Sequence, residues 1–201
     1  MKFASLVLFC TLCFCQNARA QDVYRTYHNA RFGTLVRYPA NLVAPQPESA
    51  NGDGRKFVSR DGQIELTVYG FNNAMNRTAT GEMNRAIRDW KRDTARLTYY
   101  KAGRDWFVLS GYLGADIFYE KTLLRRGVFH TLIWQYPKVL KKRLDASVSR
   151  SAASFFVEKR TQSQDPAVPR VQPTPVPTLR PTARPNSRYF KPRRRIVPRG
   201  Y

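Results

Sequence analysis

The chain has few of the residues that most often carry chemistry. Its 201 residues include three cysteines, all within the first 15 positions, and two histidines, His28 and His130. From residue 16 onwards it can therefore form neither a disulfide nor a thiolate metal site. Acidic residues are scarce too, with 14 against 35 lysines and arginines. The net charge of +21 says little about the fold, but it predicts salt-sensitive attraction to polyanions.

The first 20 residues have the pattern of a secretory signal peptide. Lys2 is followed by an uncharged run at residues 3–18 and by the small-residue sequence Ala18-Arg19-Ala20. This run is short of the roughly 20 apolar residues needed to span a bilayer, so we expect a signal that is cleaved after Ala20. Bulky residues before the cysteines argue against a lipid anchor. We thus predict a periplasmic or secreted protein of 181 residues with a net charge of +19, no cysteine and no transmembrane segment.

Two segments of different composition follow the signal. Residues 21–159 are rich in aromatic and branched side chains, whereas residues 160–201 hold nine of the 13 prolines and ten basic residues against the single acid Asp165. The second segment lacks the large apolar side chains that build a core, and its prolines remove backbone donors. We therefore predict a folded domain over residues 21–159 and a disordered, extended basic tail over residues 160–201.

Apolar periodicity and turn signals predict an α+β fold for residues 21–159. Strands are expected at 32–39, on both sides of the Arg60-Asp61-Gly62 turn within 55–70, and at 97–102, 106–113, 116–126 and 128–137. Helices are expected at 80–97, with Thr80 as the N-cap, and at 138–156. Because tight turns join successive strands, we predict an antiparallel sheet of about six to seven strands that the helices cover, an α/β sandwich.

Part of the folded segment resembles a known family. The stretches YHNARFGTLVRYPANLV (27–43), FVSRDGQIELTVYG (57–70) and SAASFF (151–156), with one long helix and a meander between them, resemble the PsbP/Mog1-like family of α/β sandwich domains, in particular its secreted bacterial members. The resemblance covers residues 24–157 and excludes the tail. It implies a non-enzymatic binding, assembly or scaffold module, on a fold that is reused for unrelated partners.

Residues that could form a catalytic site are few. Ser110, Asp116 and His130 could form a triad on neighbouring strands, but no nucleophile elbow accompanies them. His130 is better explained as a hydrogen-bonded structural residue within a strand. The acids Glu65, Asp116 and Glu120 stand singly and mostly beside basic residues, so we interpret them as solvated salt partners. A hydrolase is therefore the least favoured function.

The glycine-rich segment at 50–57 contains Asn51 and Asp53, which raises the question of a calcium loop. An EF-hand needs oxygen ligands at alternate positions over twelve residues closed by a glutamate, and this sequence does not supply them. We interpret the segment as a turn. We expect no metal and no cofactor.

The aromatic residues are interpreted as core residues first. The tryptophans lie on the predicted helix stripe and strand faces, at Trp90, Trp106 and Trp134. A stacking platform for bases or sugars would require exposed rings, and the candidate rings are those of Tyr99, Tyr100 and Tyr112.

The basic tail is the strongest functional signal. Its candidate anion- and partner-binding residues are Arg180, Arg184, Arg188, Tyr189, Phe190, Lys191, Arg193, Arg194, Arg195 and Arg199. Arginine binds phosphate and carboxylate through two parallel donors, so a flexible arm that is rich in arginine can bind many anionic surfaces. The alternative is a tail that only keeps the protein soluble.

Export decides which polyanions the chain can meet. We predict a non-catalytic binding or scaffold protein whose tail docks on an anionic envelope polymer, a membrane surface or an acidic protein partner. The alternative is a secreted nucleic-acid-binding protein, which would bind phosphates in a salt-dependent way. Export disfavours nucleic acid as the partner.

Overall fold

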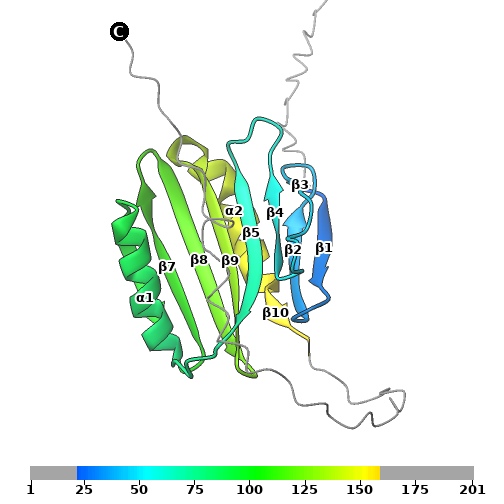
Figure 1. Ribbon diagram of the computed structural model, residues 1–201. Coiled ribbons are helices and arrows are strands. Elements are labelled where there is room, and N and C mark those ends of the chain that lie inside the picture. The colour runs from blue at the N-terminus through cyan, green and yellow to red at the C-terminus, as the bar shows by residue number, and fades with distance from the viewer. Residues whose placement is uncertain (1–21, 159–201) are drawn as a thin grey trace, which may run out of the picture.

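The computed structural model describes residues 22–158. Within this range the chain forms two antiparallel β-sheets and two α-helices (Figure 1). The expected signal peptide and the expected tail lie outside the described residues.

The larger sheet has seven strands, each antiparallel to its neighbours. In spatial order they are β3 (Ala44–Pro45), β4 (Gly54–Val58), β5 (Glu65–Asn72), β9 (Val128–Pro137), β8 (Asp116–Arg125), β7 (Trp106–Leu113) and β6 (Arg96–Ala102). Tight turns join the four consecutive strands from β6 to β9, each paired with the next. This is the predicted meander. The α+β class and the sheet of six to seven strands are confirmed.

A second sheet differs from the single sheet that the sequence pattern predicts. Its three strands, in the order β1-β2-β10, are β1 (Tyr24–Asn29), β2 (Thr34–Pro39) and β10 (Phe156–Val157). The strand expected at 32–39 is β2, but it pairs with β1 and β10 instead of the large sheet. In β1 only Tyr27 and Asn29 are buried, so its apolar alternation is too weak to identify it as a strand.

The first helix, α1 (Ala79–Arg92), differs from the prediction at both ends. Thr78 is the N-cap, because its Oγ1 accepts a hydrogen bond from the backbone N of Gly81 at 3.0 Å, and Thr80 lies inside the first turn. The helix stops before Thr94, which adopts a φ of +69°. Leu97 continues the apolar stripe in sequence but belongs to β6, where it pairs with Gly111.

The closing helix follows β9. A 3₁₀ turn, η1 (Lys138–Leu140), leads into α2 (Lys141–Ser154), which buries Leu144 and Val148. The predicted helix at 138–156 therefore ends two residues early, and β10 takes over. No helix within residues 22–158 combines the length and apolar composition that a membrane crossing needs.

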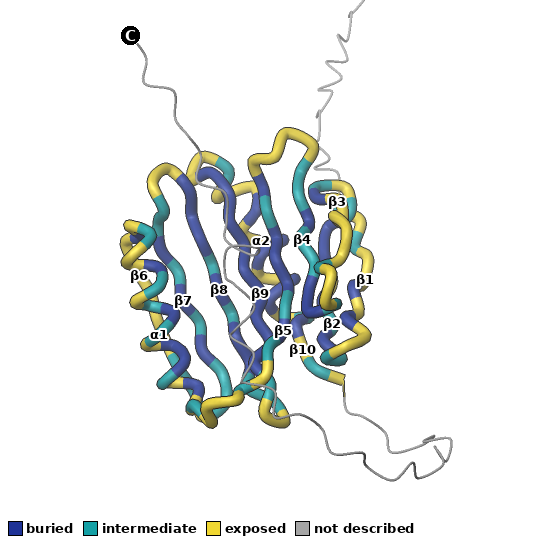
Figure 2. The backbone as a smooth tube through the Cα atoms, in the orientation of Figure 1, coloured by how far each residue is buried: buried dark blue, intermediate teal, exposed yellow. Residues whose placement is uncertain are grey.

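The core has two layers on opposite faces of the large sheet. Ile117 of β8 packs in a cluster with Leu144 and Val148 of α2, together with the small sheet. The next residue, Phe118, packs in a separate cluster with Met83 and Trp90 of α1. Because successive strand residues point to opposite faces, α1 and α2 lie on opposite sides of the sheet. Figure 2 shows that β8 and β9 between them are buried over most of their length.

Candidate binding surface

The anion-binding residues predicted in the tail lie outside the described residues. All ten, at positions 180–199, fall beyond residue 158. Their role stays a prediction. A candidate surface on the folded part must therefore be built from other residues.

The residues of the conceivable triad are not brought together. The Ser110 hydroxyl donates to the carbonyl oxygen of Phe118 at 2.9 Å, and Asp116 accepts from the Gln135 amide at 3.4 Å. His130 Nδ1 lies 2.7 Å from the hydroxyl of Thr34. Ser110 and His130 face the same side of the sheet. Their partners on β8, Tyr119 and Leu123, are four residues apart, which is about 13 Å along the strand.

His130 is a buried residue, 1% exposed. Burial lowers the pKa of its imidazole to about 4, and the charges of Arg126 and Arg125 act in the same direction. The ring is therefore neutral at pH 7 and bonded to Thr34. This arrangement is that of a structural histidine.

The glycine-rich segment forms a turn. Asp53 accepts hydrogen bonds from Ser49 Oγ at 2.6 Å and from Asn51 Nδ2 at 2.8 Å, while Gly52 has a φ of +67°. The Asp53 carboxylate is thus occupied by local donors. Across residues 22–158, no group of three or more histidine, cysteine, aspartate or glutamate side chains is arranged to hold a metal ion.

The interpretation of the single acids as solvated salt partners is wrong for Glu120 and Asp116. Both are buried, at 5% and 7% exposure. Glu120 accepts from Trp90 Nε1 at 2.6 Å and from Thr122 Oγ1 at 3.3 Å, so its partners are neutral donors on α1 and β8. Glu65 lies nearer the surface and does pair with Lys56, at 2.8 Å.

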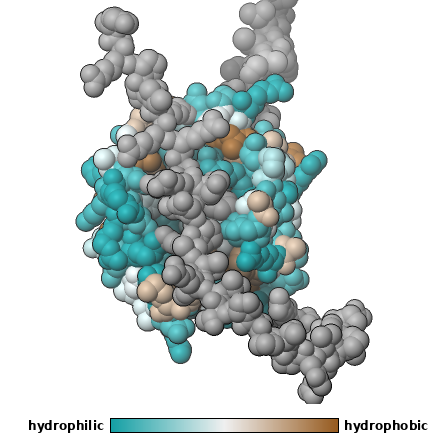
Figure 3. Space-filling model, viewed as in Figure 1, coloured by the Kyte–Doolittle hydropathy of each residue, from teal (hydrophilic) through white to brown (hydrophobic). Residues whose placement is uncertain are grey.

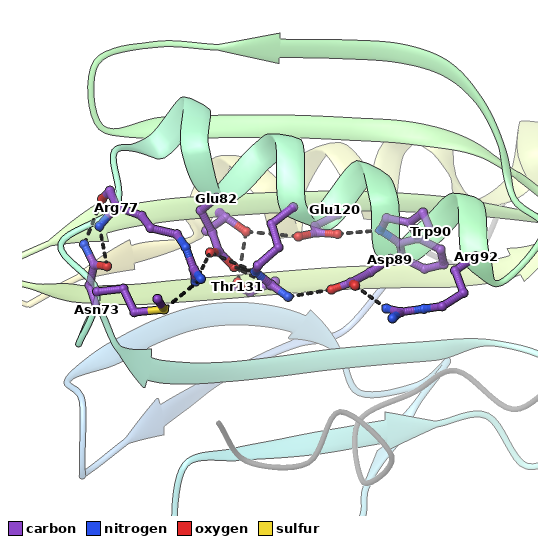
Figure 4. Close-up of polar contacts among 11 residues, drawn as sticks. Asn73, Arg77, Glu82, Asp89, Trp90, Arg92, Glu120 and Thr131 are labelled. Carbon is purple, nitrogen blue, oxygen red and sulfur yellow. Dashed lines mark hydrogen bonds and ion pairs between the residues drawn. The ribbon is translucent and has the colours of Figure 1, made fainter. Parts of the chain in front are cut away.

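Glu120 belongs to a polar network beneath α1 (Figure 4). Glu82 of α1 is 2% exposed and is held by Arg85, with Arg77 at 3.4 Å. Arg85 also reaches Asp89 at 2.6 Å. The network joins α1 to the strands below it and covers the two buried carboxyl groups.

Burial dominates the protonation of both carboxyl groups. It raises the pKa of Glu120 to about 7, although the hydrogen bonds from Trp90 and Thr122 lower it. It also raises the pKa of Glu82, against the effect of Arg85 and Arg77. Shifted carboxyl groups can mark a catalytic site, but these two are sealed between a helix and a sheet. We interpret them as part of the polar contacts that hold α1 against the sheet.

Two of the three tyrosines that the sequence singles out are exposed. Tyr99 and Tyr100 on β6 have exposed fractions of 52% and 64%, whereas Tyr112 on β7 is half-buried. β6 is an edge strand of the sheet. The tryptophans behave as predicted for Trp90 and Trp134, which are buried, while Trp106 packs at the rim of the core.

Tyr112 lies between two cations that come from different elements. The guanidinium carbon of Arg96, its partner on β6, is 4.9 Å from the ring centroid, and Nζ of Lys138 in η1 is 5.4 Å away. Both distances are within the range of cation–π attraction. Arg96 and Lys138 are exposed. We call these three residues the Tyr112 cluster.

Tyr24 forms a second cluster of the same kind. The guanidinium carbon of Arg150 on α2 is 4.9 Å from the ring centroid, and that of Arg37 on β2 is 5.6 Å away. The hydroxyl of Tyr24 donates to Asp22 at 3.5 Å. We call Tyr24, Arg37 and Arg150 the Tyr24 cluster.

The four cations of these clusters take part in none of the ion pairs within residues 22–158. Sequence inspection names Tyr112 but none of the other members. No local pattern could have found the Tyr24 cluster, because Arg37 and Arg150 are far apart in the chain and meet only through the packing of α2 on β2. The exposed guanidinium and ammonium groups are free to bind anions.

The fold and these surfaces define a PsbP-like α+β sandwich domain with a basic exterior. Among solved structures, the chain is similar to cyanobacterial PsbP (CyanoP) from Synechocystis sp. PCC 6803, with a TM-score of 0.56 and 16% identity, over 70% of this chain and 96% of that chain. At this identity the likeness shows the fold alone. No family model matches the chain, and no curated protein matches it.

Proposed function

We propose that this chain is a non-catalytic binding or scaffold protein of the periplasm or the cell exterior, which attaches to anionic envelope material or to an acidic protein partner. The basic residues of the folded domain and of the tail act together in this attachment. The proposal rests on one observation above all: Arg96, Lys138, Arg37 and Arg150 are exposed and carry no ion pair within the described residues.

The charge of the chain supports this function at long range. Residues 21–159 hold 23 basic and 13 acidic residues, and residues 160–201 add ten basic residues against one acid. Both segments therefore attract polyanions, and the attraction weakens as salt screens it.

The geometry of the catalytic residue types supports a non-enzymatic role. Ser110, Asp116 and His130 each bond to a different residue. The oxygens of Glu120 accept hydrogen bonds from Trp90 and Thr122 between α1 and β8. These groups are used to hold the fold together.

Fractionation of cells that express the full chain or a chain truncated after residue 159 tests the proposal. We expect the full chain in the envelope fraction at low salt and its release at about 1 M salt, where the Debye length is about 3 Å. The truncated chain should be released at lower salt, because it lacks ten basic residues.

Three results would contradict the proposal. Envelope association that neither salt nor truncation changes would leave the basic residues without a role. Co-purification of nucleic acid with a steep salt slope, abolished by truncation, would indicate the nucleic-acid alternative. A hydrolytic activity that His130→Ala removes would indicate an enzyme.

A further inference from the structure

The two tyrosine–cation clusters flank the same helix. Lys138 of the Tyr112 cluster lies in η1, directly before α2, and Arg150 of the Tyr24 cluster lies in the C-terminal half of α2, four residues before its last residue. Eleven residues lie between the two, so about 18–20 Å of helix separates them. Tyr112 pairs with Ile117, which packs in the core layer of α2. Both clusters are therefore on the α2 side of the large sheet.

Each cluster has an exposed apolar side chain next to it. Val139 follows Lys138 directly and is 89% exposed. Phe156 is 53% exposed and pairs with Leu35 of β2. Leu35 and Arg37 are two residues apart on one strand, so they and Phe156 share one face of the small sheet. Cations and apolar groups thus occur together at both ends of α2.

We propose that this side of the molecule docks on an anionic lipid bilayer, with α2 parallel to the bilayer and a lipid phosphate at each cluster. This inference deepens the proposed function and rests on it. The arginine forks bind phosphate oxygens, and the tyrosines are suited to the headgroup region, where one end of a ring is apolar and the other is hydrated. Val139 and Phe156 enter the boundary between headgroups and acyl chains.

The arrangement favours a bilayer over a soluble polyanion. A polysaccharide or a polyphosphate satisfies the cations but gives Val139 and Phe156 nothing apolar to enter, and an acidic protein would need an apolar patch beside its acids at both ends of α2. A bilayer surface offers phosphate and hydrocarbon at every point, so it serves both ends of α2 at once. Each Lys or Arg at an anionic surface strengthens binding about fivefold, and two clusters together exceed what either provides.

The opposite side of the sheet supplies a matched control. Arg85 and Arg92 of α1 are paired with acids, and the visible surface around α1 is mainly hydrophilic (Figure 3). Arg88 and Lys91 are exposed on this helix. Their removal changes the net charge as much as the removal of Arg37 and Arg150 does, but on the other face.

Vesicle sedimentation measures the contribution of the clusters. Protein expressed from the full-length chain is mixed with vesicles of phosphatidylcholine alone or with phosphatidylglycerol added. We expect binding only to the anionic vesicles, with a loss of about tenfold or more for the double variant Arg37→Ala/Arg150→Ala. The control, Arg88→Ala/Lys91→Ala, should change binding by no more than about twofold.

A fluorescent label tests contact with the bilayer itself. With Cys10, Cys13 and Cys15 replaced by Ala, Val139→Cys provides the single thiol of the chain for an environment-sensitive fluorophore. We expect a blue shift with anionic vesicles and none with soluble polyphosphate. The same label at Met75→Cys, 70% exposed near the start of α1, should not shift with either.

The outcomes separate this inference from the proposed function. The docking face is wrong if vesicle binding is equal for the two double variants, or if the label at residue 139 stays in water while the protein is bound. Binding to polyphosphate, DNA or an acidic peptide without vesicle binding also overturns it, but leaves an anion-binding function. Failure to bind any of these anions overturns both.

Discussion

Glu120 illustrates how position decides the chemistry of a side chain. Its sequence neighbours are Tyr119 and Lys121, which make it look like a surface salt partner. In the fold it faces α1, is 5% exposed, and accepts from Trp90. Burial raises its pKa from 4.5 to about 7. Between these two pH values the folded chain therefore holds a proton on Glu120 that the unfolded chain lacks.

The pH dependence of stability follows from this shift. The contribution of protonated Glu120 is fully present below its unfolded pKa of 4.5 and is lost as pH rises through about 7, a change of about 3 kcal/mol. His130 acts in the opposite sense, because its lowered pKa of about 4 means that its contribution is lost as pH falls. Comparing the unsubstituted protein with a Glu120 variant at each pH separates the effect of Glu120 from that of His130, because both proteins keep the histidine.

We expect Glu120→Gln to flatten the stability profile between about pH 4.5 and pH 7, the interval between the unfolded and folded pKa of Glu120. The amide remains an acceptor for Trp90 but does not ionise. Urea unfolding across this pH range measures the free energy of unfolding for both proteins. Asp145→Asn, which alters an exposed ion pair on α2, should leave the slope unchanged. Equal slopes for Glu120→Gln and the unsubstituted protein would contradict this role.

At the scale of the element, the start of α1 depends on one hydroxyl. The sequence pattern predicts Thr80 as the N-cap, two residues after Thr78. The structure selects Thr78, which has an extended backbone and bonds to Gly81. A cap must lie outside the helix, and Thr80 has already entered it.

We expect Thr78→Ala to lower the free energy of unfolding by about 1 kcal/mol. Thr80→Ala is the matched control and should change it by less than about 0.5 kcal/mol, as for surface substitutions elsewhere. Chemical denaturation of the two variants checks the assignment. A larger loss for Thr80→Ala would place the helix start where the sequence pattern puts it.

At the scale of the molecule, the two sheets act as one unit through their aromatic contacts. Phe57 of the large sheet lies 5.4 Å from the ring of Tyr27 and 4.4 Å from that of Tyr38, both on the small sheet. These rings and the inner face of α2 form one core layer. The small sheet therefore cannot open without exposing the large one.

We expect Phe57→Ala to destabilise the whole domain by about 3–5 kcal/mol in a single cooperative transition. Tryptophan fluorescence, which reports on Trp90 of α1 and on Trp106 and Trp134 of the large sheet, should change together with the far-ultraviolet circular dichroism. Phe156→Ala removes an exposed ring of the same size and should cost little. Two separate transitions would show that the sheets are independent.

The sequence by itself determined the elements that have strong local signals. The meander β6–β9, the hairpin of β4 and β5, and both helices follow from apolar periodicity and turn residues, because these depend on neighbours in the chain. The excess of basic residues, and with it the expectation of an anionic partner, also comes from composition alone. Export and the role of the tail remain predictions of the same kind.

Only the tertiary structure decided which distant residues meet. β1 and β10 become strands because β2 pairs with both, and Glu120 becomes buried because α1 covers its face of β8. The Tyr24 cluster brings α2, near the C-terminal end of the folded domain, against β1 and β2 at its N-terminal end. The reason is physical: periodicity fixes the face of a residue within its own element, whereas burial and charge proximity depend on which element packs against that face.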